Sequence, residues 1–207
     1  MTIMSMPQRV RKLTPAEYLA RERAATYRSE YFDGEMLAMA GGSPRHSLIS
    51  ASVIRELGNG LKRRPCAVYE SNLRILVSVT GLYTYPDASV ICGPLEYEDK
   101  HCDTVVNPTL IVEVLSDSTE AYDRGRKFCH YRRIATLREY LLVSQEEPTI
   151  EQFLRNDDGT WTLKVAAGVD ATLGLPSLGI QLSLREIYDK VDFSTPAPAN
   201  AQAAAGV

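Results

Sequence analysis

Apolar residues recur along the chain with two kinds of spacing, which predict one helix and a pair of buried strands. The helix expected after Ser43 has an apolar stripe that repeats every four positions: Ile49, Val53, Leu57 and Leu61. Residues 108–115 and 139–143 are almost continuously apolar, which is typical of strands covered on both faces. A helix expected over about 120–135 separates these strands, and the order strand, helix, strand favours a parallel pair.

Turn and capping signals predict shorter elements around this centre. Thr14-Pro15 followed by Glu17 is typical of a helix start, and that helix is expected to end near Ala25. Asp33-Gly34 between two strand-like runs indicates a hairpin. The remaining expected elements are two strands over 67–79 and 85–91, a hairpin formed by 149–154 and 161–165, and a short helix near 184–191. The elements together predict a mixed α/β fold.

Length and composition favour one globular domain. The 207 residues are 44% hydrophobic and 24% charged, which is ordinary for a chain that buries a sizeable core. We expect a domain over 13–193, a flexible segment over 1–12 and a disordered, Ala- and Pro-rich tail over 194–207. No stretch approaches the roughly 20 apolar residues of a membrane helix, so we expect a cytoplasmic protein with no membrane partner.

The cysteines do not indicate a cross-linked or zinc-binding protein. They are widely spaced and form no CxxC pair: Cys66, Cys92, Cys102 and Cys129. Neither a disulfide framework nor a zinc ribbon is therefore expected, and the thiols are interpreted as buried or incidental.

Two carboxylates lie in or beside the expected strands. Glu113 interrupts the apolar run 108–115, where an ionised carboxylate is costly unless a cation or hydrogen-bond donors receive it. Taken alone, Glu113 fits a structural role, at an exposed strand end or in a structural ion pair, as well as it fits a functional one. Asp87 follows Pro86 near the start of its own strand, so both side chains reach one point if the two strands are neighbours. Such a pair of oxygen ligands suits Mg²⁺.

A basic segment follows Glu113 in the sequence. Residues 124–138 contain six Lys or Arg and no acid, although the net charge of the chain is −3. Lys127 shares a helix face with Asp123 and Tyr131 by four-residue spacing. The segment is either a solvent-exposed face with an Asp–Lys pair or a phosphate-binding surface. In the second interpretation the DNA-binding residues are Arg124, Arg126, Arg132 and Arg133.

These residues resemble the restriction endonuclease-like proteins within the PD-(D/E)XK nuclease superfamily. The resemblance covers roughly residues 14–191, and its most specific portions are 85–90 and 108–134. It implies a restriction endonuclease-like core, in which helices flank a mixed central sheet. It also implies that Pro86-Asp87 is the PD element and that Glu113 is the second acid.

The resemblance implies a relocated catalytic lysine. The superfamily usually has its lysine two residues after the second acid, where this chain has Leu115. Lys127 matches the position at which this family carries a lysine on the next helix. Glu30 and His46 also match family positions and are further candidates, although a hairpin glutamate and a helix-start histidine are ordinary surface residues.

The expected function is Mg²⁺-dependent DNA cleavage. Asp87 and Glu113 are expected to hold the ion, with Mn²⁺ as a substitute, and Lys127 to assist the nucleophile or the transition state. DNA is the expected partner, and we expect a homodimer. Two other functions stay open: a nucleic-acid-binding protein of the same fold that has lost cleavage, and a structural or regulatory partner protein.

Overall fold

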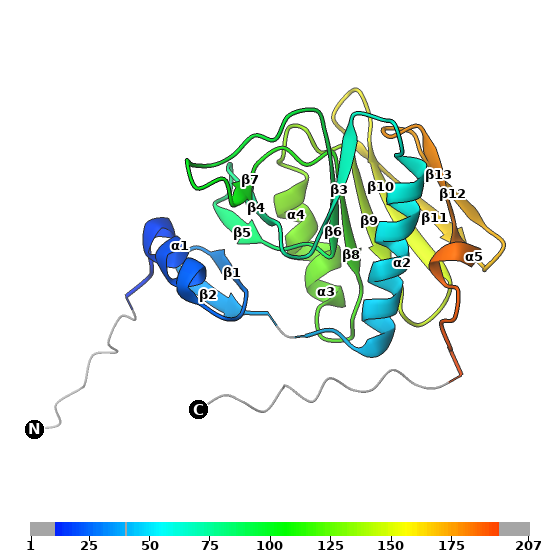
Figure 1. Ribbon diagram of the computed structural model, residues 1–207, viewed down its shortest axis with the longest axis horizontal. Helices are drawn as coiled ribbons and strands as arrows, with labels where there is room; N and C mark the ends of the chain where they lie inside the picture. Colours follow the sequence, from blue (N-terminus) through cyan, green and yellow to red (C-terminus); the bar gives the residue numbers. More distant parts are fainter. Residues whose placement is uncertain (1–10, 40, 195–207) are drawn as a thin grey trace, which may run out of the picture.

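The computed structural model describes residues 11–39 and 41–194, and Figure 1 shows their arrangement. Residues 1–10 and 195–207, which make up most of the predicted flexible start and disordered tail, lie outside the described residues. In the described part the strands form a six-stranded sheet, a five-stranded sheet and a two-stranded hairpin. The predicted mixed α/β fold is confirmed.

The six-stranded sheet is the centre of the fold. Its order is β11 (Trp161–Ala167), β10 (Thr149–Arg155), β9 (Glu139–Val143), β8 (Leu110–Val114), β6 (Ala88–Cys92) and β3 (Cys66–Glu70). β8 and β9 pair in parallel, as predicted, and the other neighbours are antiparallel. Every residue of β8 and β9 is buried, because both faces of this sheet are covered.

Helix α2 (Pro44–Gly60) covers one face of this sheet, together with α5 (Leu184–Ile187) and the hairpin β12 (Thr172–Leu175) and β13 (Ile180–Ser183). The predicted apolar stripe of α2 is buried in the resulting core: Ile49, Val53, Leu57 and Leu61. Figure 1 shows α3 (Glu120–Tyr122) and α4 (Phe128–Tyr131) on the opposite side of β8, and the π-helical η1 (Asp123–Lys127) joins them. These segments pack on a second core that includes Ile111, Tyr131 and Tyr140.

The five-stranded sheet carries the amino-terminal part of the chain. Its order is β2 (Glu35–Ala38), β1 (Ser29–Phe32), β5 (Leu82–Thr84), β4 (Arg74–Val77) and β7 (Thr104–Val105). Helix α1 (Pro15–Ala24) begins with the predicted capping box between Thr14 and Glu17. Tyr18 of α1 stacks on Tyr31 of β1 with ring centroids 4.8 Å apart. The hairpin predicted around Asp33-Gly34 is β1–β2.

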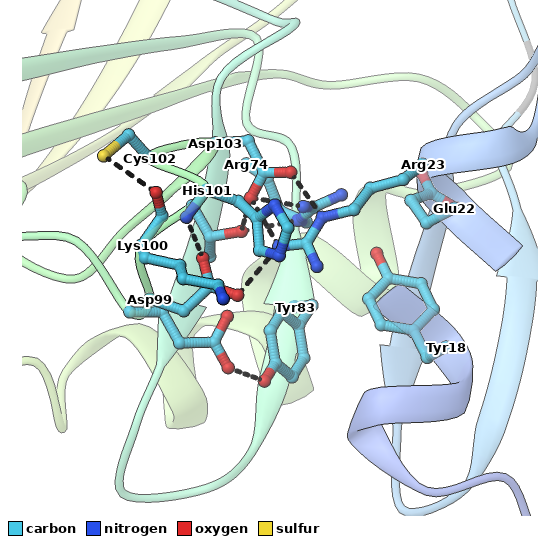
Figure 2. A network of polar contacts seen from close by, with 12 residues as sticks. Tyr18, Glu22, Arg23, Arg74, Tyr83, Asp99, Lys100, His101, Cys102 and Asp103 are labelled. Atoms are coloured by element: carbon cyan, nitrogen blue, oxygen red, sulfur yellow. Dashed lines mark hydrogen bonds and ion pairs between the residues drawn. The ribbon is translucent and has the colours of Figure 1, made fainter. Parts of the chain in front are cut away.

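A polar network ties α1 to the strand that leads to Asp87. Figure 2 shows that Arg23 of α1 and the buried Arg74 of β4 both reach Asp103. Their nitrogens lie 2.7 and 2.9 Å from its carboxylate oxygens. The hydrogen bond from Arg23 holds the pKa of Asp103 well below its usual value, and Arg74 adds to this effect. Arg74 also donates to the Tyr85 hydroxyl at 2.9 Å, and that hydroxyl donates to Glu22 at 2.9 Å. The network thereby anchors the residue two positions before Asp87.

Three predictions from the sequence were wrong in detail. The two strands expected over 67–79 and 85–91 are four strands, β3 to β6, because the turn after Glu70 redirects the chain into the second sheet. The helix expected over 120–135 is three segments: α3 (Glu120–Tyr122), the π-helical η1 (Asp123–Lys127) and α4 (Phe128–Tyr131).

The third correction concerns the cysteines. Cys66 and Cys92 form a disulfide, whereas Cys102 and Cys129 are free and exposed. The cause is the antiparallel register of β3 and β6, which places Cys66 directly opposite Cys92. The spacing of the cysteines in sequence does not reveal this pairing of strands.

Candidate active site

Asp87 and Glu113 come together at one end of the β6–β8 pair. In the register of these strands Ala88 lies opposite Val112, so one further step along each strand brings Asp87 opposite Glu113. Side chains at opposite positions of an antiparallel pair point to the same face of the sheet. Asp87 Oδ2 also accepts a hydrogen bond from the backbone N–H of Val114 at 2.7 Å. The backbone of β8 therefore fixes the Asp87 carboxylate beside Glu113.

Lys127 approaches Glu113 from η1 and lies among three buried carboxylates. Its Nζ is 3.0 Å from Glu113 Oε1, 3.1 Å from Glu30 Oε1 and 3.3 Å from Asp123 Oδ1. The Tyr131 hydroxyl donates to the same Glu113 oxygen at 2.8 Å. The ammonium group is thus held in one position by acids from β1, β8 and η1.

The local helix geometry and the core explain how the lysine reaches this point. Asp123 and Lys127 are the first and last residues of the π-helical segment, and π turns within helices are frequent at functional sites. Leu115, at the usual lysine position, is instead buried in the second core. A positive charge at that point would be surrounded by apolar side chains, so the cation that pairs with Glu113 comes from the helical segment.

His46 completes the arrangement on the other side of Asp87. The Ser43 hydroxyl caps α2 by accepting the His46 N–H at 3.1 Å, and His46 Nε2 lies 3.2 Å from Asp87 Oδ2. Burial lowers the pKa of His46, but the hydrogen bond and charge of Asp87 outweigh burial, and the net direction is upward. Glu30 and His46, which the sequence offered as secondary candidates, therefore both lie in direct contact with the principal ones.

These residues line a cleft of about 610 Å³ that is strongly acidic. The acidic residues among its described lining are Glu30, Glu70, Asp87, Glu113, Asp117, Asp123 and Glu146. Arg28 and Lys127 are the permanently charged cations in the same described lining, and Lys127 is already paired. A phosphate group entering this cleft meets an excess of negative charge, which a bound cation would offset.

The donor set fits a hydrated divalent cation. Mg²⁺ typically takes one or two protein carboxylates and keeps several waters, and Asp87 and Glu113 supply such a pair. Asp123 Oδ1 is buried and makes no hydrogen bond to the described residues, beyond its ion pair with Lys127. Residues 11–39 and 41–194 contain no group of three or more His, Cys, Asp or Glu side chains arranged to hold a metal ion. An ion held by two acids and otherwise hydrated is the arrangement that fits.

Burial and neighbouring charge alter the proton affinity of this cluster. Burial raises the pKa of Glu113 well above its ordinary value of 4.5; Lys127 opposes the rise, and the negative charges of Asp123 and Asp87 add to it. Burial also raises the pKa of Asp123. Lys127 stays protonated, because the adjacent carboxylates, Glu113 foremost, outweigh the effect of its burial and raise its pKa.

The raised pKa of Glu113 predicts a pH dependence of stability. Between the ordinary glutamate pKa and the raised one, the native state binds more protons than the unfolded state, so the free energy of unfolding falls as pH rises. We expect this slope in protein treated with EDTA, measured by urea unfolding at several pH values. Glu113→Gln, which cannot ionise, is expected to have a shallower slope. An identical slope in both proteins would contradict the assignment.

The four arginines proposed to bind DNA have different environments. Arg124 makes ion pairs with Glu120 at 2.7 Å and with Glu151 at 2.5 Å. Arg126, Arg132 and Arg133 are exposed. The acidic cleft includes none of these four among its described lining residues.

Sequence reasoning missed two contributors to the cluster. Asp123 and Tyr131 were recognised as sharing a helix face with Lys127, but not as site residues. Their signal was the four-residue spacing on each side of Lys127, which by itself is equally typical of a solvent-exposed ion pair. Arg28, which lines the cleft, was also missed. No sequence pattern indicates it, because its position in the cleft depends on how β1 is paired.

The mixed sheet flanked by helices is a restriction endonuclease-like core, and the family match defines the chain as a nuclease-type protein. The family model Uma2, described as "Putative restriction endonuclease", matches residues 15–185, and the chain belongs to this family. The resemblance inferred from the sequence is confirmed.

Related sequences and a solved structure agree with this assignment. Two relatives come from Synechocystis sp. (strain ATCC 27184 / PCC 6803 / Kazusa). "Uncharacterized protein slr1290" is 41% identical over 88% of this chain and 94% of its own length. "Uncharacterized protein sll1609" is 36% identical over 78% and 91%. A crystal structure from Anabaena variabilis ATCC 29413, described as a putative nuclease belonging to DUF820, has a TM-score of 0.69 at 19% identity, covering 85% of this chain and 97% of that one. This last similarity shows the fold.

A transmembrane helix is not found in the described part of the chain, where every helix is too short or too polar to cross a bilayer.

Proposed function

We propose that this protein is a metal-dependent DNA endonuclease that hydrolyses phosphodiester bonds in the acidic cleft. The observation that carries the proposal is the position of Lys127, which is buried, in contact with three acids and 3.0 Å from Glu113, which in turn lies opposite Asp87. A lone structural ion pair needs one acid, whereas this lysine contacts three, and a fourth acid adjoins them. An excess of carboxylates around one fixed cation suits a site that receives a metal ion and a phosphate.

The proposed metal ligands are Asp87 and Glu113. A divalent cation bound there would supply Lewis-acid stabilisation of phosphoryl charge and acidify a water molecule at neutral pH. Contacts with the backbone N–H of Val114 and with His46 orient the Asp87 carboxylate through Oδ2. The Tyr131 hydroxyl and Lys127 orient Glu113 through Oε1. Both acids are therefore preorganised, which lowers the cost of arranging them during the reaction.

Lys127 is proposed to stabilise negative charge that develops on the phosphate. Its ammonium group carries three donor hydrogens, and its contacts with Glu30, Glu113 and Asp123 keep it protonated. Glu30 and Asp123 are positioning residues in this scheme, because they act on the substrate only through Lys127. If one of its carboxylate partners is neutralised, an N–H of Lys127 becomes available to donate to a substrate oxygen.

The direct test is metal-dependent cleavage of plasmid DNA by the purified protein. We expect nicking or cutting with Mg²⁺ or Mn²⁺, full inhibition by EDTA, and no cleavage by Glu113→Ala. Glu186→Ala is a matched control, since Glu186 is an exposed acid on α5 outside the cleft. Cleavage that persists in Glu113→Ala would indicate a contaminating nuclease. DNA binding without cleavage by the wild type would instead favour an inactive binding protein of the same fold.

A further inference from the structure

A second hollow, of about 570 Å³, lies where the second core reaches the surface beside β11. Aromatic and apolar side chains form its walls. Phe128 is central, with its ring centroid 4.3 Å from that of Phe153 and 5.4 Å from that of Trp161. Leu163 extends the wall along β11 and is 51% exposed. We call the site formed by Phe128, Phe153, Trp161, Leu163, Arg132 and Arg133 the aromatic–arginine pocket.

The tryptophan of this pocket is held in place. Trp161 pairs across the strands with Arg155, whose guanidinium carbon lies 5.7 Å from the centre of the indole ring. Arg155 is itself anchored, because its Nη1 donates to the Ile134 carbonyl at 2.9 Å. The edge contact with Phe128 restrains the ring further. A ligand that stacks on a side chain already fixed in this way pays little conformational entropy.

The pocket also carries positive charge that forms no ion pair with an acid in the described part of the chain. The side chains of Arg132 and Arg133 are exposed and make no hydrogen bond or ion pair to the residues that the structure describes. Acidic residues are absent from the described lining. Asp158 lies in the adjacent turn, where its carboxylate accepts hydrogen bonds from the N–H and hydroxyl of Thr160 at 2.8 and 2.6 Å and forms no ion pair with either arginine among the described residues. Unpaired guanidinium groups beside aromatic rings favour an anion that has flat apolar surfaces.

The acidic cleft gives a reason for such a site. Its seven acids disfavour the phosphates of DNA, so that affinity for a polyanion has to come from another surface. Among the described residues, the aromatic–arginine pocket combines free arginines with partly exposed aromatic rings. Bases stack on aromatic side chains only where they are not already stacked in a duplex, which selects single-stranded segments.

We propose that the aromatic–arginine pocket binds single-stranded nucleic acid, with a base stacked on its aromatic wall and the flanking phosphates paired to Arg132 and Arg133. The proposal rests on the proposed function in taking DNA as the ligand, but the pocket is separate from the cleft and does not need metal. It assigns substrate affinity to one end of the basic segment and cleavage to the acidic cleft.

Trp161 makes the proposal measurable, since it is the only tryptophan in the 207 residues. Titration of the full chain with a ten-nucleotide oligo(dT) in EDTA is expected to quench its fluorescence. A ten-unit abasic strand, which has the phosphates but no bases, is expected to bind at least about 5-fold more weakly, because stacking on one aromatic side chain accounts for a factor of roughly 5 to 100.

Substitutions separate the two parts of the pocket. The double variant Arg132→Ala/Arg133→Ala is expected to weaken binding and to lower the slope of log affinity against log salt by about 1.4, since each phosphate that an arginine neutralises adds about 0.7 to that slope. Arg21→Ala is the matched control, since Arg21 is an exposed arginine of α1 that does not line the pocket. Trp161→Leu, followed by anisotropy of a labelled oligonucleotide, is expected to weaken binding by roughly 5- to 100-fold.

Each contrary result overturns the proposal. Binding of oligo(dT) without quenching would show that the strand binds away from Trp161. Equal affinity for the abasic strand would show that charge, and not base stacking, accounts for binding. Quenching by poly-glutamate at the same concentration would point to an acidic protein segment instead. If Trp161→Leu fails to fold, the arginine variants, which change only exposed side chains, still decide the question. The binding experiments are done in EDTA, so their outcome does not depend on whether the protein cleaves plasmid DNA.

Discussion

Replacing Lys127 with alanine is expected to slow DNA cleavage by about 100-fold or more, while DNA affinity stays nearly unchanged. The magnitude is that of removing one preorganised electrostatic group from a transition state. Affinity is expected to persist, because Lys127 is buried and already paired with acids in the free protein. Single-turnover cleavage with Mg²⁺ measures the first quantity, and binding with Ca²⁺ in place of Mg²⁺ measures the second.

The same substitution is expected to destabilise the fold, which calls for a control. Removal of the lysine leaves Glu30, Glu113 and Asp123 without their shared cation, and removing one partner of a buried ion pair typically costs about 3–5 kcal/mol. Assays are therefore run well below the melting temperature of each variant. Lys62→Ala, which removes an exposed lysine outside the cleft, is expected to cleave like the wild type. Equal cleavage by Lys127→Ala would exclude Lys127 from the reaction.

Mg²⁺ or Mn²⁺ is expected to raise the melting temperature of the wild type by several degrees. An ion that binds only the native state adds about 2.7 kcal/mol at 100 times its Kd, or roughly 5–10 °C for a domain of this size. Neutralising the mutual repulsion around Glu113 is the physical source of the effect.

Substitution of one metal ligand isolates this stabilisation. Asp87→Ala is expected to abolish the shift, and Glu186→Ala, which alters an exposed acid outside the cleft lining, to preserve it. The measurement is thermal unfolding by circular dichroism over a wide range of metal concentrations. A wild-type melting temperature that does not change over this range would argue against a specific metal site.

The sequence predicts the elements whose signal is local. The four-residue stripe of α2, the apolar runs of β8 and β9, and the capping box at Thr14 are each visible within a few residues, and all three are present. The neighbouring positions of Asp87 and Glu113 follow from the pairing of two strands that the sequence identifies separately. The sequence alone does not show that these two strands pair, so the structure was needed to establish it.

Features that depend on contacts between distant segments could not be predicted. The disulfide joins residues 26 positions apart through the pairing of β3 with β6, and no local pattern encodes that register. Burial of Glu30 depends on β1 pairing with β5, which brings the Thr84 hydroxyl to donate to the Glu30 carboxylate. The same residue in an unpaired hairpin would be an ordinary surface glutamate.

The π-helical turn at Asp123–Lys127 bears on how such proteins are recognised from their sequences. A π turn is in effect an α-helix with one residue inserted, and each residue of an α-helix rotates the chain by about 100°. The insertion therefore reorients the residues on either side of it, without any change in the strands that carry the acids. The proposed role of Lys127 depends on the position of its ammonium group beside Glu113 and not on the interval between the two residues in the sequence. A pattern that requires a fixed interval between acid and lysine does not detect this arrangement, whereas a search for the spatial arrangement of charges does.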